Sequence, residues 1–366
     1  MLGPEGLHQH CASERDLTHM RKPSPVSALS ARFLCEKGVL RMARVLITLV
    51  VFFAASALSS SPIAAQTAPP RLADGRPDLQ GVWDFRTITP LQRPQMLGDR
   101  AALTEEEAAA FEAQAAATQT ALLESIGGTI GAYNAFWFDL GTNVIESRRT
   151  SLIVDPPDGR LPALVEGAGR QVGSLTRDVP GERPVRYRSG GIGLDGPEDR
   201  ALAERCLVGF NSGPPMMPSG YNNNMQLFQT PDHVVILNEM VHDVRSIPLT
   251  SRPHLDGIRQ WMGDPRGHWE GDTLVVESQN FSDMTSSFDP GATGGVGTGT
   301  TLHLTERFTR LDENTLLYEY TVDDPSTFTR PFTVALPMRK SALPVFEYAC
   351  HEGNYGLLNM LRGARA

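Results

Sequence analysis

Alternation of apolar and polar residues dominates the second half of the chain. Leu302, Leu304 and Phe308 alternate with polar neighbours, and the same pattern runs through 316–322 after a turn at 312–314. A period of two is typical of antiparallel strands with one buried face. The sequence therefore predicts successive hairpins, with strands at 226–229, 233–248, 259–262, 274–279, 302–310, 316–322, 329–338 and 345–351.

A helical pattern marks 103–125. Thr104 and Glu107 form a capping box, and alanine, glutamate and glutamine fill the segment that follows. The sequence predicts a helical arm at about 103–125, with shorter helices at 197–207 and 355–362.

These patterns predict a mainly β fold, an antiparallel barrel-like (lipocalin-like) meander with an N-terminal helical arm. The 34 glycines and 27 prolines favour short strands and many turns over a helical bundle. The tripeptide Gly81-Val82-Trp83 resembles the one that opens lipocalin-type barrels. The alternative is that Trp83 is simply a buried residue at the start of a strand.

The N-terminal region predicts export. Arg44 precedes an apolar run at 45–58, and Ala64-Ala65 supplies small residues for cleavage, so 42–65 read as a secretory signal peptide. Met42 stands where a start codon is expected, and we interpret 1–41 as a mis-assigned extension of the gene. The apolar run is too short for a stable membrane anchor, and no later run is long enough to span a bilayer. We expect a periplasmic or secreted protein with a single domain over 66–366.

Two of the four cysteines, Cys206 and Cys350, lie after residue 65. Disulfides persist in exported proteins, so we predict that these two pair, with two free buried thiols as the alternative. Such a bond would close a loop of about 144 residues, for which the chain-entropy model gives at most about 4–5 kcal/mol.

The charge balance argues against a nucleic-acid partner. Residues 1–65 hold seven of the 33 basic and four of the 42 acidic residues, which leaves a net charge of −12 on the remainder. Binding to phosphates needs clustered lysine and arginine. We expect a small-molecule ligand or substrate instead, and the sequence predicts no oligomeric state.

Histidines in the β region are the main candidates for chemistry, because imidazole exchanges protons near neutral pH. On the predicted strand 233–248, Asn238 and His242 share an apolar face, so we expect both to point inward. His268 and Glu270 flank a turn predicted at the barrel mouth, and His351 follows Cys350. The candidate catalytic residues are His242, His268, Glu270 and His351.

Each candidate has a structural alternative. His242 could be a satisfied core histidine, and His268 with Glu270 a surface hairpin pair. His351 with Glu352 could cap the C-terminal helix. Three neutral imidazoles suit zinc, so His242, His268 and His351 could form a zinc site. The spacing of these residues in the sequence does not support such a site, so we expect no metal and no organic cofactor.

Substrate-binding candidates flank the same region. They are Tyr221, Asn222 and Asn223 in a polar loop, and Asn238 and Arg245 on the predicted strand. The alternatives are that the asparagines only form turns, and that Arg245 pairs with Asp243, as Arg266 would with Asp264.

Familiar catalytic motifs are missing from the sequence. Residues 191–196 match the dinucleotide-binding pattern, but no apolar strand precedes them and no βαβ unit surrounds them. The chain also has no nucleophile elbow, no zinc-binding helix of the His-Glu-x-x-His type and no P-loop.

Several long segments resemble a family of exported bacterial hypothetical proteins with no settled function. The resemblance implies export and a single unit over 66–366, and it carries no activity or catalytic residues. The segments that carry it include DGRPDLQGVWDF (74–85), RQWMGDPRGHWEGDTLVVES (259–278) and FEYACHEGNYG (346–356).

The sequence favours an enzyme that uses acid–base chemistry, a lyase, hydratase or hydrolase acting on a small organic or sugar-like molecule. The first alternative is a periplasmic small-molecule binding protein without catalysis, and the second is a structural or surface-interaction protein. A real site requires the candidate residues to converge on one pocket.

Overall fold

The computed structural model describes residues 68–126, 138–171, 196–290, 294–352 and 354–365. The predicted signal peptide, the extension before it and nearly all of the 191–196 motif lie outside the described residues. Residues Thr67–Ala366 form one compact unit.

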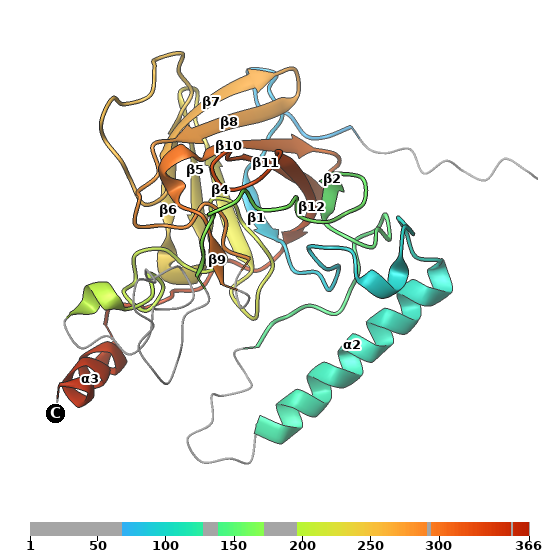
Figure 1. Ribbon diagram of the computed structural model, residues 1–366. Coiled ribbons are helices and arrows are strands. Elements are labelled where there is room, and N and C mark those ends of the chain that lie inside the picture. Colours follow the sequence, from blue (N-terminus) through green and yellow to red (C-terminus); the bar gives the residue numbers. More distant parts are fainter. Residues whose placement is uncertain (1–67, 127–137, 172–195, 291–293, 353, 366) are drawn as a thin grey trace, which may run out of the picture. The chain divides into compact units, whose positions relative to one another are not determined.

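Twelve strands and two α-helices are the main regular elements of the described chain (Figure 1). Short 3-10 turns lie at η2 (Gln95–Leu97), η4 (Pro197–Asp199), η5 (Met240–His242) and η6 (Gly299–Thr301), and the helices are α2 (Glu105–Ile126) and α3 (Tyr355–Ala364). The strands are β1 (Gly81–Asp84), β2 (Ile153–Asp155), β3 (Arg170–Gln171), β4 (Asn224–Gln229), β5 (His233–Asn238), β6 (Val244–Pro248), β7 (Asp264–Glu270), β8 (Thr273–Gln279), β9 (Gly295–Val296), β10 (His303–Arg310), β11 (Thr315–Asp323) and β12 (Phe332–Ser341).

Ten of these strands form one antiparallel sheet, which confirms the mainly β prediction. Nine follow the order β6-β5-β4-β1-β12-β11-β10-β8-β7, and β2 pairs with β12 beside that path. The first strand, β1, lies between β4 and β12, so it joins the β4–β6 hairpins to the strands of the C-terminal half. The order therefore departs from a simple meander.

The sheet is not closed into a barrel, and the barrel prediction is wrong in that respect. With nine strands paired antiparallel, the edge strands β6 and β7 run in the same direction, and an antiparallel ladder cannot join them. One isolated parallel bridge, Leu249 to Gly267, spans these edges. A Cβ atom on Gly267 would lie 2.8 Å from Leu249 Cδ2 and 3.0 Å from Ile247 Cγ2, so glycine permits this approach.

Apolar side chains from the inner face of the sheet form the main core. Trp83, Phe308 and Tyr318 are fully buried there. Met216 also enters this core, and its backbone N–H donates to the hydroxyl of Tyr318 at 3.1 Å. The interior of the curved sheet is therefore filled by side chains and by the segment around Met216.

Most predicted elements have a counterpart in the structure. The hairpin of β10 and β11 pairs His303 with Asp323 through to Arg310 with Leu316, as its alternation predicts. The predicted capping box begins α2, because the Glu107 N–H donates to Thr104 Oγ1 (3.1 Å) and the Thr104 N–H to Glu107 Oε2 (2.9 Å).

Three strand predictions are wrong. Residues 259–262 and 345–351 form no strand, and the predicted strand 233–248 is a hairpin of two strands. The strand β7 was missed because Pro265 and Gly267 lower its strand propensity; its pairing with β8 stabilises it instead. The predicted helix 197–207 is reduced to the 3-10 turn η4.

Candidate acid–base site at the β5–β6 turn

The turn between β5 and β6 holds the first candidate histidine. The strands pair Leu237 with Val244, which leaves 238–243 as the connection. Two residues of this turn are left-handed, Val241 at φ 60° and His242 at φ 49°. A left-handed β-branched residue is a genuine outlier, and such strain persists only where the surroundings enforce it.

Packing of the buried residues Met240 and Val241 enforces the turn. Met240 and Val241 pack with Cys206 in a small apolar cluster that Phe210, Tyr221, Tyr348 and Cys350 complete. The predicted disulfide Cys206–Cys350 is present, with its Cα atoms 5.9 Å apart. It ties the C-terminal segment covalently to this cluster.

Asp243 fixes the far end of the turn. Its carbonyl accepts the Asn238 N–H at 2.8 Å, and its carboxylate accepts the Gly209 N–H at 2.7 Å and the hydroxyl of Ser212. The predicted Asp243–Arg245 pair is wrong, because Asp243 bonds to these groups of the 209–212 segment.

His242 is exposed, so the prediction that it points inward is wrong. A continuous strand would place it on the face of Asn238, but the turn interrupts the alternation. Asn238 stays on the buried face, only 1% exposed, while Arg245 and Ile247 become the buried positions of β6. The extra residues of the turn thus separate the two side chains that period-two reasoning had paired.

The imidazole of His242 is held in one tautomer by a carbonyl group. Its Nδ1 lies 2.9 Å from the backbone oxygen of Tyr348. A carbonyl oxygen only accepts, so Nδ1 must carry the proton, and Nε2 of the neutral ring has a free lone pair. This ring is therefore arranged as a proton acceptor.

His351 lies beside it and is also exposed. The two ring centroids are 5.7 Å apart, with the rings inclined at 53°. Two of the four catalytic candidates therefore converge, although 109 positions separate them in the sequence.

A hollow of about 390 Å³ adjoins His242, and His351 is not among the residues that line it. Its lining includes Asn238, Glu239, His242, Phe346, Glu347 and Glu352. The buried carboxylate of Glu239 accepts from Asn224 Nδ2 (2.7 Å) and from the Phe346 N–H (3.1 Å), which holds the 345–349 segment against the turn. Sequence reasoning missed Tyr348, which carries no motif, and alternation along one continuous strand placed Glu239 on the face opposite His242.

Asn238 has both side-chain amide atoms buried and without a hydrogen-bond partner in the described part of the chain. Buried amides normally bond to protein or to an ordered water. Asn238 is the last residue of β5 and is itself among the residues that line the hollow.

His268 and Glu270 form an exposed pair at the end of β7. Their side chains lie 3.3 Å apart, and Glu270 accepts from Arg307 at 2.8 Å. Hydrogen bonds from Arg307, and then from His268, lower the pKa of the Glu270 carboxyl. Neither residue lines the hollow beside His242, so this pair matches the surface alternative.

The loop 221–223 has a structural role. Asn223 is fully buried, and its side chain bonds to the backbone of Ser219 and Asp139. Asn222 is left-handed at φ 52°, and Tyr221 packs edge-on against Phe210 with centroids 5.4 Å apart. These residues hold the cluster behind the histidine pair and do not line the hollow.

Arg245 lies in the core, where its predicted role in substrate binding is replaced by a buried ion pair. Its guanidinium donates to both oxygens of Glu306 at 3.0 and 2.5 Å, and Tyr318 donates to Glu306 Oε1 at 2.7 Å. Burial would lower the pKa of Arg245, but the facing carboxylate outweighs burial and raises it. Burial, reinforced by Glu306, raises the pKa of Tyr318 well above its usual value.

Arg266 pairs with Asp264 at 2.5 Å, as the sequence suggested. Within the described ranges, no group of three or more His, Cys, Asp or Glu side chains is placed to hold a metal ion. No helix of those ranges is both long and apolar enough to cross a membrane.

Comparison of the chain with known protein families, curated proteins and solved structures found no match. The functional argument therefore rests on the geometry of the site.

Proposed function

We propose that this protein is an exported enzyme that performs acid–base chemistry on a small organic molecule in the hollow beside His242 and His351. One observation carries the proposal: the Tyr348 carbonyl fixes the proton on Nδ1 of His242 and leaves Nε2 as an exposed base. The left-handed backbone at 241–242 supports it, because strain of this kind clusters at functional sites.

The two imidazoles suit the elimination of water from a substrate and the reverse reaction, hydration. His242 Nε2 would take a proton from carbon next to a carbonyl group, and the electron pair would form the new double bond. His351, protonated, would give its proton to the departing hydroxyl, which leaves as water. The reverse sequence is hydration, and attack by an activated water would make the same pair a hydrolase.

Carboxylates define the substrate charge. Glu347 and Glu352 line the exposed side of the hollow and Glu239 lies at its buried side. Like charges repel an anionic substrate, which favours a neutral, sugar-like or cationic molecule.

Nuclear magnetic resonance can test the base without a known substrate. The ¹⁵N shifts of His242 at high pH should show the Nδ1–H tautomer, because the carbonyl of Tyr348 accepts from that atom. Exposed His303 is the control, and we expect it to favour the ordinary mixture of tautomers. A dominant Nε2–H form at His242 would exclude the proposed base.

A substrate screen then tests catalysis. Neutral hydroxy-carbonyl compounds and sugar derivatives would be assayed for dehydration, hydration and hydrolysis. His242→Gln retains a donor for Tyr348 but cannot accept a proton, so we expect kcat to fall by about 10²-fold or more. His303→Gln should leave it unchanged. An active protein in which H242Q keeps full kcat would refute the assignment.

Export is testable separately. Expressed in a Gram-negative host, the full chain should yield a periplasmic protein whose N-terminal residue, identified by mass spectrometry, is Gln66. An uncleaved cytoplasmic chain would contradict the signal-peptide interpretation.

A further inference from the structure

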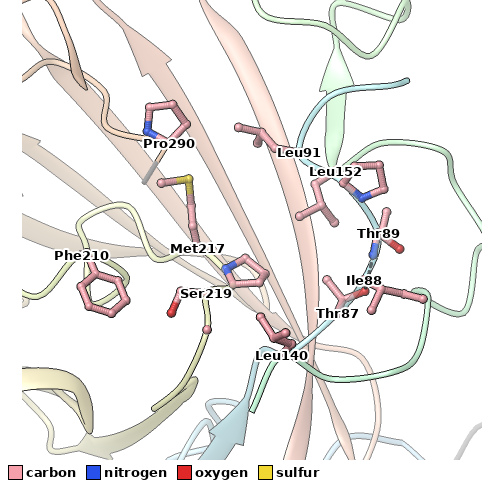
Figure 2. A pocket seen from close by; sticks show the side chains of 13 residues that line it. Thr87, Ile88, Thr89, Leu91, Leu140, Leu152, Phe210, Met217, Ser219 and Pro290 are labelled. Carbon is pink, nitrogen blue, oxygen red and sulfur yellow. Dashed lines mark hydrogen bonds between the residues drawn. The ribbon is translucent and has the colours of Figure 1, made fainter. Parts of the chain in front are cut away.

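A second cavity, of about 430 Å³, shares no lining residue with the hollow beside His242 and has a different chemical character (Figure 2). None of the thirteen residues that line it is charged. Its size falls within the range of small-molecule sites in proteins. We propose that this cavity binds a neutral, mainly apolar small molecule, independently of any chemistry at His242.

The walls are apolar and come from distant parts of the chain. Figure 2 shows Phe210 and Met217 on one side of the cavity and Leu152 and Thr89 on the other. Met217 is only 9% exposed, and a thioether side chain adapts to ligands of different shape. Leu140 is 39% exposed, which leaves apolar surface in contact with solvent that a ligand could cover.

Backbone hydrogen bonds hold the walls together before any ligand arrives. The Ile88 N–H donates to the Asn143 carbonyl at 3.0 Å, and the Leu152 N–H to the Pro90 carbonyl at 2.8 Å. The Asp139 N–H also donates to the Gly220 carbonyl at 2.7 Å. A pre-formed cavity spares a ligand the cost of ordering its site.

The hydroxyl groups of the cavity are already engaged. Thr87 Oγ1 donates to the Asn143 carbonyl (3.0 Å) and accepts the Thr89 N–H (3.1 Å), while Thr89 Oγ1 accepts the Ile145 N–H (3.0 Å). Ser219 Oγ donates to the Tyr221 carbonyl at 3.2 Å and keeps lone pairs to accept with. A ligand with one donor group can therefore form a hydrogen bond to Ser219 Oγ. A charged ligand would lose its hydration without gaining a partner for its charge.

Two dyes of one ring system test the charge preference. N-phenyl-1-naphthylamine is neutral with a single N–H, and 8-anilinonaphthalene-1-sulfonate adds a sulfonate. Titrated into the native protein, the neutral dye should give a saturable fluorescence increase with one site, and the anionic dye should bind at least tenfold more weakly. Absence of saturable uptake of the neutral dye, or tighter binding of the sulfonate, would overturn the proposal.

A cavity-filling variant locates the site. Ser219→Phe places a ring in the cavity and should weaken binding of the neutral dye at least tenfold, while Ser246→Phe, the same change at an exposed position of β6, should not. Leu140→Ala removes exposed apolar contact without altering the core, and should weaken binding about threefold. Native-like affinity in both S219F and L140A would show that the dye binds elsewhere and would refute the assignment.

Discussion

Removing the arginine of the buried ion pair should destabilise the protein strongly. In Arg245→Met, the methionine replaces most of the apolar stem, but Glu306 loses both guanidinium bonds. The Glu306 side chain has no exposed surface, and its remaining bond comes from the hydroxyl of Tyr318. Breaking a buried pair from one side costs about 3–5 kcal/mol, because an uncompensated charge stays behind.

The loss of stability in R245M comes from the unpaired carboxylate of Glu306 and not from the contacts that the arginine side chain no longer makes. The double variant Arg245→Met with Glu306→Leu removes both charges, and replacing a buried pair by apolar residues is often neutral. The Nε of Arg245 already lacks a partner in the described residues, which lowers the net value of the pair. We therefore expect the double variant to be more stable than the single one.

Urea unfolding followed by tryptophan fluorescence measures both free energies. Arg307→Met, the same change in the exposed pair with Glu270, is the control and should leave the midpoint unchanged. A loss below about 1 kcal/mol, or a double variant no better than R245M, would refute the reasoning.

Three further changes test the scaffold. Replacing Cys206 and Cys350 by serine releases a loop of 144 residues and should cost about 2–5 kcal/mol in urea unfolding, and equal stability of oxidised and mutant protein would contradict this. Burial opposes ionisation of Asp324, but hydrogen bonds from the surrounding serine and threonine hydroxyls outweigh it and lower its pKa. The carboxylate therefore stabilises the fold above about pH 4 and less as pH falls, so the Asp324→Asn deficit seen at pH 7 should fade below that range and a deficit that persists in acid would oppose this. Thr104→Ala removes the cap of α2 and should raise amide exchange in its first turn about fivefold, whereas unchanged exchange would show that the cap contributes nothing.

Local patterns determined much of this protein without any knowledge of its tertiary structure. Alternation over 302–322 predicted the β10–β11 hairpin, and Thr104 with Glu107 predicted the start of α2. The pairing of Cys206 with Cys350 followed from counting the cysteines that lie after the predicted signal peptide. These features depend on residues close together in the sequence or on the number of cysteines, so the sequence alone is enough to predict them.

The tertiary structure alone decided which residues form the site. Six residues between Leu237 and Val244 turn the predicted strand back on itself, which exposes His242 and buries Arg245. The hydrogen bond from His242 to Tyr348 and the tilted ring contact of His242 with His351 join positions over a hundred residues apart. Alternation defines two faces of a strand but not where the strand ends or which face becomes the inside, because those depend on partners that pack from elsewhere in the chain.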